Sequence, residues 1–453
     1  MMLVLRKTVH SSRYIGLKKV GEVSGFRRIR MDIVIIAQYL GDLEHLETTN
    51  GRFIYLAKML AERNKVEIIT TTFPHSLKRQ AKFVPDSYEG CKITALYEPG
   101  YSKNVCLKRF VSHYRLARNV ERYLNHRKKP DIIYAAVPSL SVASVAAKFC
   151  RKNSVRFIVD IQDLWPEAFK MVFHLPVISD LVFLPMQKQA DFIYSSADEI
   201  VAVSKTYADR ALCVSKKCKE AKVVYLGTDK NIFDKWASQL EFQSKSKAET
   251  GRKALYQKLV RTILKEKSWQ KIVHLVYIGT LGHSYDISTI LSAIRKLPDK
   301  DRKKLQFVIM GDGPKKKQFQ KEAKGLPVIF TGMVEYPEMV WLLCHCDIAI
   351  NPIQKGAAQS IINKHMDYAM SGLPVISTQE CDEYEQLLAE NRCGINCICG
   401  NSSSVRKAIK HLIDHEELRK EMGRRHREVA ERLFDRGQSY KNITNIIEDG
   451  KGR

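Results

Sequence analysis

Short apolar runs alternate with longer amphipathic stretches over the first half of the chain. The apolar runs cover residues 31–38, 65–71, 130–136, 155–161, 198–204 and 221–226, and the first of them reads MDIVIIAQ. Each run has the length and composition of a buried strand, and GRFIYLAKMLAERN (51–64) has the spacing of an amphipathic helix. Near-continuous apolar strands that alternate with helices predict a parallel sheet covered on both faces.

The alternation stops between Asp229 and Lys271, where the chain is polar, rich in lysine and only weakly helical. It then resumes in the apolar runs 272–279, 305–311, 327–332, 346–352 and 373–377, which predict a second doubly wound sheet. Two further helical stretches, 415–434 and 437–450, close the chain.

These patterns predict five segments in an α/β fold of two doubly wound, Rossmann-like domains that face each other across a cleft. A basic leader (1–30) lacks the apolar core of a signal peptide, and we expect it to be disordered and to have been appended before Met31. We place the first Rossmann-like domain at 31–230, a linker with a basic helical insertion at 231–271 and the second domain at 272–425. Helices in 426–453 are expected to pack back on the first domain.

Composition narrows the class of protein. The 453 residues are 45% hydrophobic and 27% charged, as in globular proteins, and the formal net charge of +26 attracts anions such as nucleic acid, anionic lipid or a phosphate-bearing substrate. No helix-turn-helix, RNA-recognition or zinc-finger signature accompanies this charge, so we expect no nucleic-acid partner. The sequence contains no run of eighteen or more uncharged apolar residues, so we predict no transmembrane helix.

The eleven cysteines are scattered, which is typical of a reducing, cytosolic protein. Two local groups, 344–346 and 393–399, lie in or beside expected strands rather than on loops with zinc-ligand spacing. We interpret them as core thiols, and we expect no metal site and no cofactor.

The stretch QSIINKHMDYAMSGLPVIS (359–377) predicts a helix, a turn at Gly372 and a buried strand. Lys364 and Asp367 share a face of this helix, and an exposed ion pair is the simple explanation. However, the helix follows the strand 346–352, and doubly wound sheets bind ligands at the carboxyl ends of their strands. A lysine at a helix N-terminus favours an anion, and an aspartate one turn later can accept hydrogen bonds from a diol, so the pair fits a nucleotide diphosphate.

Three glycine-containing turns are expected to reach the same cleft: 279–282 (GTLG), 311–314 (GDGP) and the turn that starts at Thr331. Each is weak evidence alone, because glycine commonly follows strands in such folds. Their order along the chain is the stronger signal.

In this order, the motifs resemble those of the retaining family 4 glycosyltransferases of the GT-B fold, over Met31 to Asn445. The matching pieces are TTNGRFIYLAKMLAERNKVEIIT (48–70), VDIQDLWPE (159–167), DEIVAVS (198–204), VVYLGTDKNIF (223–233), YIGTLG (277–282), VIMGDGP (308–314), VIFTGMV (328–334), CDIAINP (346–352) and NKHMDYAMSGLPVIS (363–377). DLWPE (163–167) resembles the branch that builds bacterial surface polysaccharides. A capped loop around a buried Trp165 is the structural alternative.

The sequence departs from the family pattern at the donor site. The family often has two glutamates separated by seven residues, and the aligned positions hold Gln359 and Asp367. Asp367 keeps the acid one methylene shorter, whereas Gln359 loses the charge. Where many members carry Arg and Lys after the first strand of the second domain, this chain has Thr280 and Tyr285, so Lys364 is expected to carry more of the phosphate charge.

A further departure is Gln162, where many members place a histidine before Asp163. This combination fits the polysaccharide branch and is also compatible with an enzyme of reduced activity.

The resemblance implies transfer of a hexosyl or N-acetylhexosaminyl group from a nucleotide-diphosphate sugar, with retained configuration and no metal. Lys364, the helix amides, the backbone near Gly282 and Arg52 would stabilise the departing diphosphate. Gln359 would orient the sugar. In full, the implied catalytic residues are Lys364, Gln359 and Asp163; the donor-binding residues are Gly51, Arg52, Thr280, Leu281, Gly282, Gly311, Gly313, Met333, Ser360, Ile361, Ile362 and Asp367; and the acceptor side has Gln162, Trp165 and Glu167.

The expected helix at 107–129 interleaves aromatic side chains with cations, and the segment 171–186 is strongly apolar. An ordinary helix with a solvated basic face is the simple interpretation. The sharper one is docking on an anionic membrane, at the cytoplasmic face, to reach a lipid-linked glycan of capsule, O-antigen or exopolysaccharide synthesis.

Two alternatives stay open: a nucleotide-sugar epimerase of the same fold and a basic nucleic-acid-binding protein. An epimerase needs acid and base groups at the sugar, where Gln359 and Gln162 offer none.

Overall fold

The structure is a computed structural model that describes residues 30–46, 51–104, 106–170, 176–238, 269–357, 360–361 and 363–449. The predicted leader, except Arg30, and residues 239–268 of the predicted linker lie outside the described residues, as do Gln359 and Ile362. Residues Met1–Arg30 and Met31–Arg453 are separate units, and the second is described below.

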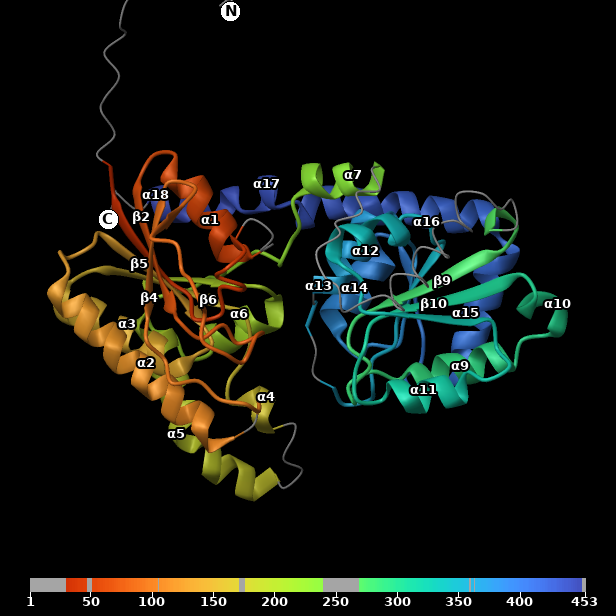
Figure 1. The fold of residues 1–453 in the computed structure, drawn as a ribbon, viewed down its shortest axis with the longest axis horizontal. Coiled ribbons are helices and arrows are strands. Elements are labelled where there is room, and N and C mark those ends of the chain that lie inside the picture. The colour runs from red at the N-terminus through yellow and green to blue at the C-terminus, as the bar shows by residue number, and fades with distance from the viewer. Residues whose placement is uncertain are drawn as a thin grey trace, which may run out of the picture. The chain divides into compact units, whose positions relative to one another are not determined.

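The first half of the chain forms an eight-stranded sheet in the order β3-β4-β2-β1-β5-β6-β7-β8 (Figure 1). All neighbouring strands are parallel except β3 and β4, which form an antiparallel pair. The predicted strands are present, while β3 and β4 were not predicted. The strands are β1 (Asp32–Ile36), β2 (Lys65–Thr71), β3 (Ser87–Tyr88), β4 (Cys91–Leu96), β5 (Ile132–Val137), β6 (Arg156–Ile161), β7 (Glu199–Ala202) and β8 (Lys222–Val223).

Helices cover both faces of this sheet because its central strands place apolar side chains on both faces. In β1, Ile33 and Ile35 enter one core, whereas Val34 and Ile36 enter the other. The helix α1 (Arg52–Ala61) packs in the first of these cores. The described helices that contribute to the second core are α2 (Leu107–His126), α3 (Leu140–Asn153), the short α4 (Glu167–Lys170), α5 (Pro176–Ser196) and α6 (Lys205–Leu212).

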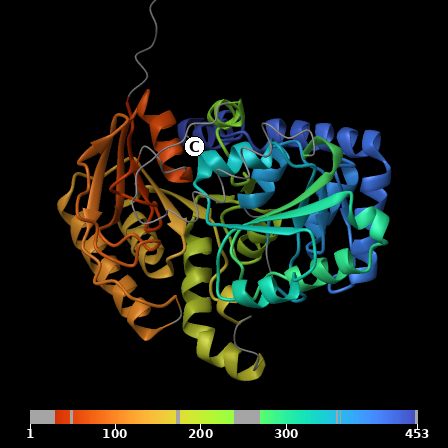
Figure 2. The ribbon, with the colours of Figure 1, turned by 45° about the vertical axis from the view of Figure 1, so that its right-hand side comes forward.

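The second half forms a six-stranded, fully parallel sheet in the order β11-β10-β9-β12-β13-β14 (Figure 2). The strand order therefore reverses between β9 and β12, and ligands bind at such a switch point. The strands are β9 (Val273–Ile278), β10 (Leu305–Met310), β11 (Val328–Gly332), β12 (Ile348–Asn351), β13 (Val375–Ser377) and β14 (Gly394–Asn396). The helices are α9 (Ile287–Arg295), α10 (Asp299–Arg302), α11 (Lys316–Glu322), α12 (Tyr336–Leu343), α13 (Asn363–Met370), α14 (Asp382–Glu390) and α15 (Ser402–Asp414), and a 3₁₀ turn (Trp269–Lys271) precedes β9. The prediction of two doubly wound sheets is confirmed.

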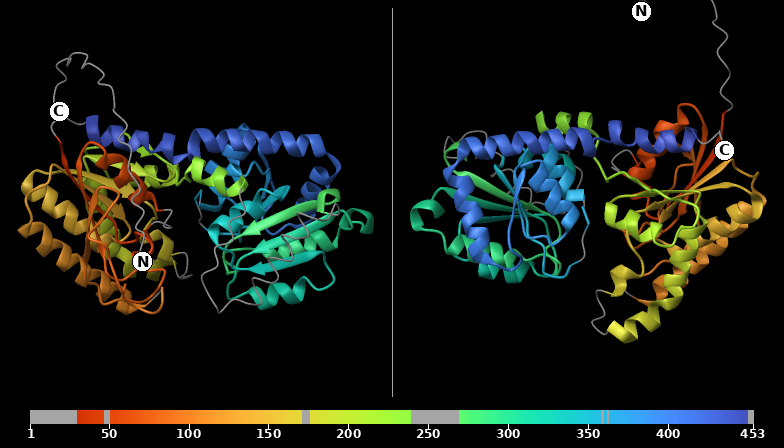
Figure 3. Two further views of the ribbon diagram at one scale, coloured as in Figure 1. Left: turned by 45° about the horizontal axis from the view of Figure 1, so that its top comes forward. Right: turned by 180° about the vertical axis from the view of Figure 1, so that it is seen from behind.

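The chain passes between the two cores twice. Phe233 of α7 (Lys230–Ser238) packs in the core of the second sheet. The last helices are α16 (Glu416–Val429), a π-helical turn (Ala430–Phe434), α17 (Arg436–Ser439) and α18 (Lys441–Asp449) (Figure 3). Ile443 and Ile447 of α18 pack in the core of the first sheet. Among the described helices, none has the length and apolarity that crossing a membrane requires.

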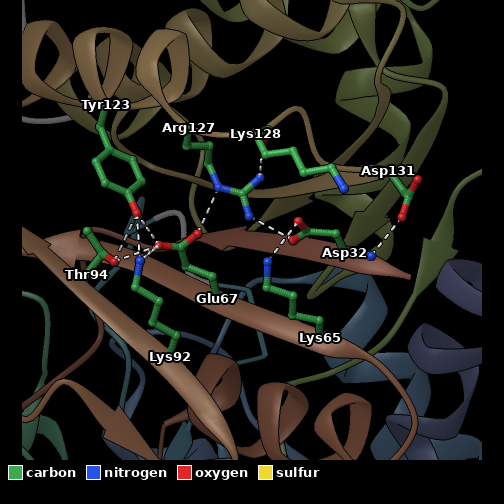
Figure 4. Close-up of polar contacts among 9 residues, drawn as sticks. All are labelled: Asp32, Lys65, Glu67, Lys92, Thr94, Tyr123, Arg127, Lys128 and Asp131. Carbon is green, nitrogen blue, oxygen red and sulfur yellow. Dashed lines mark hydrogen bonds and ion pairs between the residues drawn. The ribbon is translucent and has the colours of Figure 1, made fainter. Parts of the chain in front are cut away.

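An ion-pair network ties the end of α2 to the first sheet (Figure 4). Arg127 contacts Glu67 at 2.9 Å and Asp32 at 2.7 Å. Burial raises the pKa of Glu67, but its hydrogen bonds and the nearby Arg127 outweigh this and lower the pKa to about 2. Three more side chains donate to Glu67: Tyr123, Thr94 and Lys92. Because Asp32 starts β1, this network lies toward the amino ends of the strands, away from the ligand-binding edge.

Candidate active site

The helix α13 is fixed at the switch point of the second sheet by one tyrosine. The Tyr368 hydroxyl accepts a hydrogen bond from the Ile278 amide (3.0 Å) and donates to the Ile350 carbonyl (3.1 Å). These contacts join α13 to the ends of β9 and β12. The helix starts at Asn363, because Ser360 and Ile361 still belong to the loop after β12, so the predicted start near Gln359 is wrong.

Lys364, in the first turn of α13, is a buried lysine. Lys364 is only 7% exposed, and its Nζ makes no hydrogen bond within the described part of the chain. Nζ lies 3.8 Å from the ring centre of Tyr285 and 4.7 Å from that of Tyr277. Burial lowers the pKa of Lys364 well below its usual value. An anion at this position would therefore supply the charge partner that Lys364 lacks among the described residues.

Asp367 is 8% exposed and does not pair with Lys364. Its Oδ1 accepts a hydrogen bond from the Tyr336 hydroxyl (2.6 Å) at the start of α12. Burial raises the pKa of Asp367 to about 7. The simple explanation of Lys364 and Asp367 as an exposed ion pair is therefore wrong, because both residues are buried and each has different neighbours. The predicted diol contact of Asp367 stays a prediction.

The predicted glycine turns lie side by side and require glycine for close backbone approach. A Cβ at Gly311 would lie 1.8 Å from the Gly279 carbonyl oxygen, and one at Gly313 would lie 2.5 Å from that of Leu281. The Leu281 amide donates to the Asp312 carbonyl (2.9 Å), and the Gly311 amide donates to Gly332 (2.8 Å). The three turns thus form one backbone surface at the carboxyl ends of β9, β10 and β11.

Lys364 lies directly beside this surface. A Cβ at Gly279 would lie 4.0 Å from Lys364 Nζ. The Tyr277 hydroxyl donates to the Thr280 carbonyl (2.8 Å), which holds the turn against the ring that contacts the lysine. The structure therefore brings the predicted residues Thr280, Leu281, Gly282, Gly311 and Gly313 together with Lys364.

The other predicted donor-side residues lie around this group. Met333, just after β11, is 70% exposed. Ser360 is buried, and its carbonyl accepts a hydrogen bond from the side-chain Nε2 of Gln379 (3.2 Å), while Ile361 is fully buried. Gln359 and Ile362 lie outside the described residues.

The predicted contact of Arg52 with the diphosphate stays a prediction, and in this structure its guanidinium is engaged within the first domain. Its guanidinium contacts Asp160 through Nε (2.8 Å) and Nη2 (3.3 Å), and Nη1 donates to the Val224 carbonyl (2.9 Å). All three nitrogens are thus used inside the first domain, and Arg52 is only 4% exposed. Gly51, which precedes it, is the N-cap residue of α1.

The residues predicted on the acceptor side make contacts within the protein. Gln162 donates to the same Asp160 (2.7 Å), and Glu167 pairs with Arg210 (2.6 Å). Asp163 accepts hydrogen bonds from the Leu164 amide (3.0 Å) and from Trp165 Nε1 (3.2 Å), and burial raises its pKa. Trp165 is 5% exposed. This geometry is that of the structural alternative, a capped loop around a buried tryptophan.

Sequence reasoning missed the tyrosines that line the site. Tyr277, Tyr336 and Tyr368 hold Thr280, Asp367 and the two strands in place, but no spacing along the chain marks them. The expected core thiols divide between buried ones (Cys346 and Cys393) and half-buried ones (Cys344, Cys397 and Cys399). Within the described ranges, no group of three or more His, Cys, Asp or Glu side chains is arranged to hold a metal.

Comparison with known proteins finds a protein-family model that covers this site. The family model described as glycosyl transferases group 1 matches residues 273–415, which include the three turns and α13. The chain carries a glycosyltransferase domain. The prediction that the protein is a transferase of sugars is thereby confirmed, and the finer assignments are taken up below.

Three similar proteins extend beyond this domain. The chain is 21% identical over 402 residues to the sulfoquinovosyl transferase SQD2 of Arabidopsis thaliana, covering 86% of this chain and 68% of the relative. HepE of Anabaena, solved in complex with UDP, aligns with a TM-score of 0.64 at 15% identity, over 92% of this chain and 100% of that one. Sucrose-phosphate synthase of Thermosynechococcus elongatus gives a TM-score of 0.66 at 13% identity, over 93% and 99%. The structural matches confirm the predicted GT-B fold.

Proposed function

We propose that this protein is a retaining, family 4-type glycosyltransferase that uses a nucleotide-diphosphate sugar. The observation that carries the proposal is Lys364, buried at the start of α13, with no polar partner among the described residues and beside the glycine turns. A diphosphate placed there would meet the lysine, the free amides of the helix and the turn backbone. The complexes of HepE with UDP and with UDP-glucose support a nucleotide sugar as the donor, and the name of the relative SQD2 supports transfer of a sugar.

The proposed reaction breaks the bond between the anomeric carbon and the diphosphate oxygen. The acceptor hydroxyl forms the new bond on the same face of the sugar, and its proton leaves with the nucleoside diphosphate. Negative charge grows on the departing diphosphate, so Lys364 acts more strongly in the transition state than in the bound donor. Asp367, held by Tyr336, is positioned one turn later to accept hydrogen bonds from the ribose diol.

The acceptor is proposed to be a lipid-linked glycan of bacterial surface-polysaccharide synthesis, reached by peripheral docking on the cytoplasmic face of the membrane. An exposed apolar surface of α2 and α5 supports this. Phe169 joins the two helices, at 5.9 Å from Phe110 and 6.1 Å from Phe183, measured between ring centres. The exposed apolar residues of this surface are Leu107, Phe110, Val111 and Tyr114 on α2 and Leu181, Val182 and Leu184 on α5.

Cations flank this apolar surface along α2. Arg115, Arg118 and Arg122 are all exposed, which is the combination of apolar insertion and basic charge that peripheral membrane helices use. Vesicle pelleting should require anionic lipid and weaken at high salt, because salt screens surface charge. Changing the three arginines to Gln should reduce pelleting, whereas the matched change of Lys300, Lys303 and Lys317 in the second domain should not. Equal binding to neutral vesicles would contradict the docking proposal.

The central test is product analysis after a thermal-shift screen of nucleotide sugars. A specific donor stabilises the fold by mass action, and that donor is then incubated with and without candidate acceptors. Transfer of the sugar with retained anomeric configuration supports the proposal. Isomerisation of the sugar would identify an epimerase instead, and stabilisation by nucleic acid but by no nucleotide sugar would point to the basic-protein alternative.

A further inference from the structure

A second group of charged and aromatic side chains lies at the ligand-binding edge of the first sheet. The order β4-β2-β1-β5 places a switch point between β1 and β5. Tyr39 follows β1, Lys78 follows β2 and Tyr101 follows β4, while Arg109 lies in the first turn of α2. Segments far apart in sequence thus meet at the carboxyl ends of adjacent strands.

Arg109 is the deepest cation of this group. It is 8% exposed, and its Nη1 and Nη2 donate to the Asn104 carbonyl (2.7 Å) and the Tyr39 hydroxyl (2.9 Å). Its Nε makes no hydrogen bond within the described residues. The guanidinium carbon lies 4.6 Å from the ring centre of Trp165 and 5.5 Å from that of Tyr101. The arginine is thus desolvated by aromatic rings while one donor stays unused.

Lys78 brings a second cation to the same aromatic wall. Its Nζ lies 2.9 Å from His75 Nδ1 and 4.6 Å from the ring centre of Tyr101, which also contacts Arg109. Lys78 and His75 are half-buried, so the group is reachable from solvent on this side. Burial and the charge of Arg109 both lower the pKa of Lys78.

The described residues provide neither cation with a carboxylate partner. Glu98 interacts electrostatically with Arg109, but its oxygens accept hydrogen bonds from Gln38 (3.0 Å to each oxygen) and Ser112 (2.8 Å) and form no ion pair with it. The two histidines add no charge near neutral pH, because burial and the cations lower the pKa of His75 to about 4 and that of His113 to about 3. Two adjacent cations in an aromatic surround therefore lack full compensation.

We propose that Lys78 and Arg109 form a subsite that binds a phosphate-type oxyanion of the acceptor. The proposal rests on the transferase function above, because the donor diphosphate is already assigned to Lys364 in the second domain. Arg109 supplies an Nε–H that is unused among the described residues, and Lys78 supplies a half-buried ammonium; together they suit a tetrahedral oxyanion. The aromatic rings exclude water and strengthen both contacts. The acceptor would then carry a phosphate or diphosphate ester near the hydroxyl that receives the sugar.

Calorimetric titration with pyrophosphate separates the two sites. The background is Lys364→Met, in which the donor site has lost its cation. In this background pyrophosphate should still bind, and adding Lys78→Gln should raise its Kd about tenfold or more, because a charged hydrogen-bond donor is lost. Arg109→Gln should act in the same direction. Lys148→Gln, at an exposed position of α3, is the matched control and should leave the Kd unchanged.

The outcomes are distinct. Loss of pyrophosphate binding on the Lys364→Met change alone would overturn the subsite, as would equal Kd values with and without Lys78→Gln. Melting curves of each variant show whether it is folded, and the half-buried Lys78 gives a readout even if Arg109→Gln does not fold. Absence of binding of every nucleotide sugar in the thermal-shift screen to the unmodified protein would instead refute the proposed donor function. Titration with a phosphorylated lipid and with inorganic phosphate then distinguishes an acceptor headgroup from free phosphate.

Discussion

Replacing Lys364 by methionine should remove activity while leaving the fold at least as stable. Methionine is unbranched, apolar and only slightly shorter than lysine, so most of the packing beside Tyr277 and Tyr285 is kept without the charge. In the native protein the ammonium is buried with no polar partner among the described residues, and this costs stability. The expected result is a melting temperature equal to or above that of the unmodified protein at pH 7.

The direction of the pH effect follows from the pKa. The folded state holds the pKa of Lys364 well below 10.5, so the unfolded chain binds more protons between the two values. The native protein is therefore penalised below the folded pKa and regains stability as the pH rises toward 10.5. The advantage of Lys364→Met should be largest at low pH and should vanish at high pH.

The expected loss of turnover is large. Removing one donor from developing negative charge costs roughly 10²–10³-fold in kcat, or about 3–4 kcal/mol of transition-state stabilisation. Lys364→Ala should lose turnover similarly but also lose about 2–3 kcal/mol of stability, because the lost side chain leaves a cavity against the two tyrosines. The difference between the two variants separates packing from charge.

The assay is initial-rate kinetics with the donor identified by the thermal-shift screen, beside thermal melts from pH 6 to 10. Lys317→Met is the matched control, since this lysine is exposed on α11, and it should change neither measurement. Near-normal turnover of Lys364→Met would refute the site assignment. A clear fall in its melting temperature would refute the claim that the charge is uncompensated.

Three further changes test other parts of the structure. Burial raises the pKa of Asp367 from 3.8 to about 7, so the native state loses stability as the pH rises through this range. The variant Asp367→Asn should therefore melt at a higher temperature than the native protein above pH 7 and at the same temperature below pH 4. A difference in melting temperature that does not change with pH would contradict this. The pKa of Glu67 is lowered from 4.5 to about 2, so this residue contributes stability that is present above pH 4.5 and lost as the pH falls through 2. The variant Glu67→Gln should therefore lower the free energy of unfolding, measured with urea at pH 7, by on the order of 2–3 kcal/mol. An unchanged free energy of unfolding would exclude a net gain from the network. The variant Gly311→Ala should lower both stability and nucleotide affinity, because its Cβ would collide with the Gly279 carbonyl. The control Gly325→Ala has a positive φ but no atom within 4 Å of the added Cβ, so it should cost only backbone strain. Equal effects of the two variants in thermal melts and UDP titrations would contradict the close approach.

Local pattern predicted a large part of this protein. The apolar runs specified strands such as β1 and β9, since strand and helix periods depend on neighbours in sequence. The presence of a helix with Lys364 after β12 followed from the same kind of signal, whereas its start at Asn363, which puts Lys364 in the first turn, came from the structure. The glycine turns at Gly279 and Gly311 were also visible, although only the structure shows that their backbones touch.

The tertiary structure decided which side chains meet. Arg52 and Asp160 are 108 residues apart, and their pairing depends on how α1 packs on the sheet. Tyr336 reaches Asp367 because α12 and α13 pack in the same core. Lys78 and Arg109 come together only because β2 ends and α2 begins at the same edge of the sheet. Strand order is set by the packing of the whole core rather than by local sequence, and it brings these groups together. For this reason, only the tertiary structure shows which charged side chains share a site.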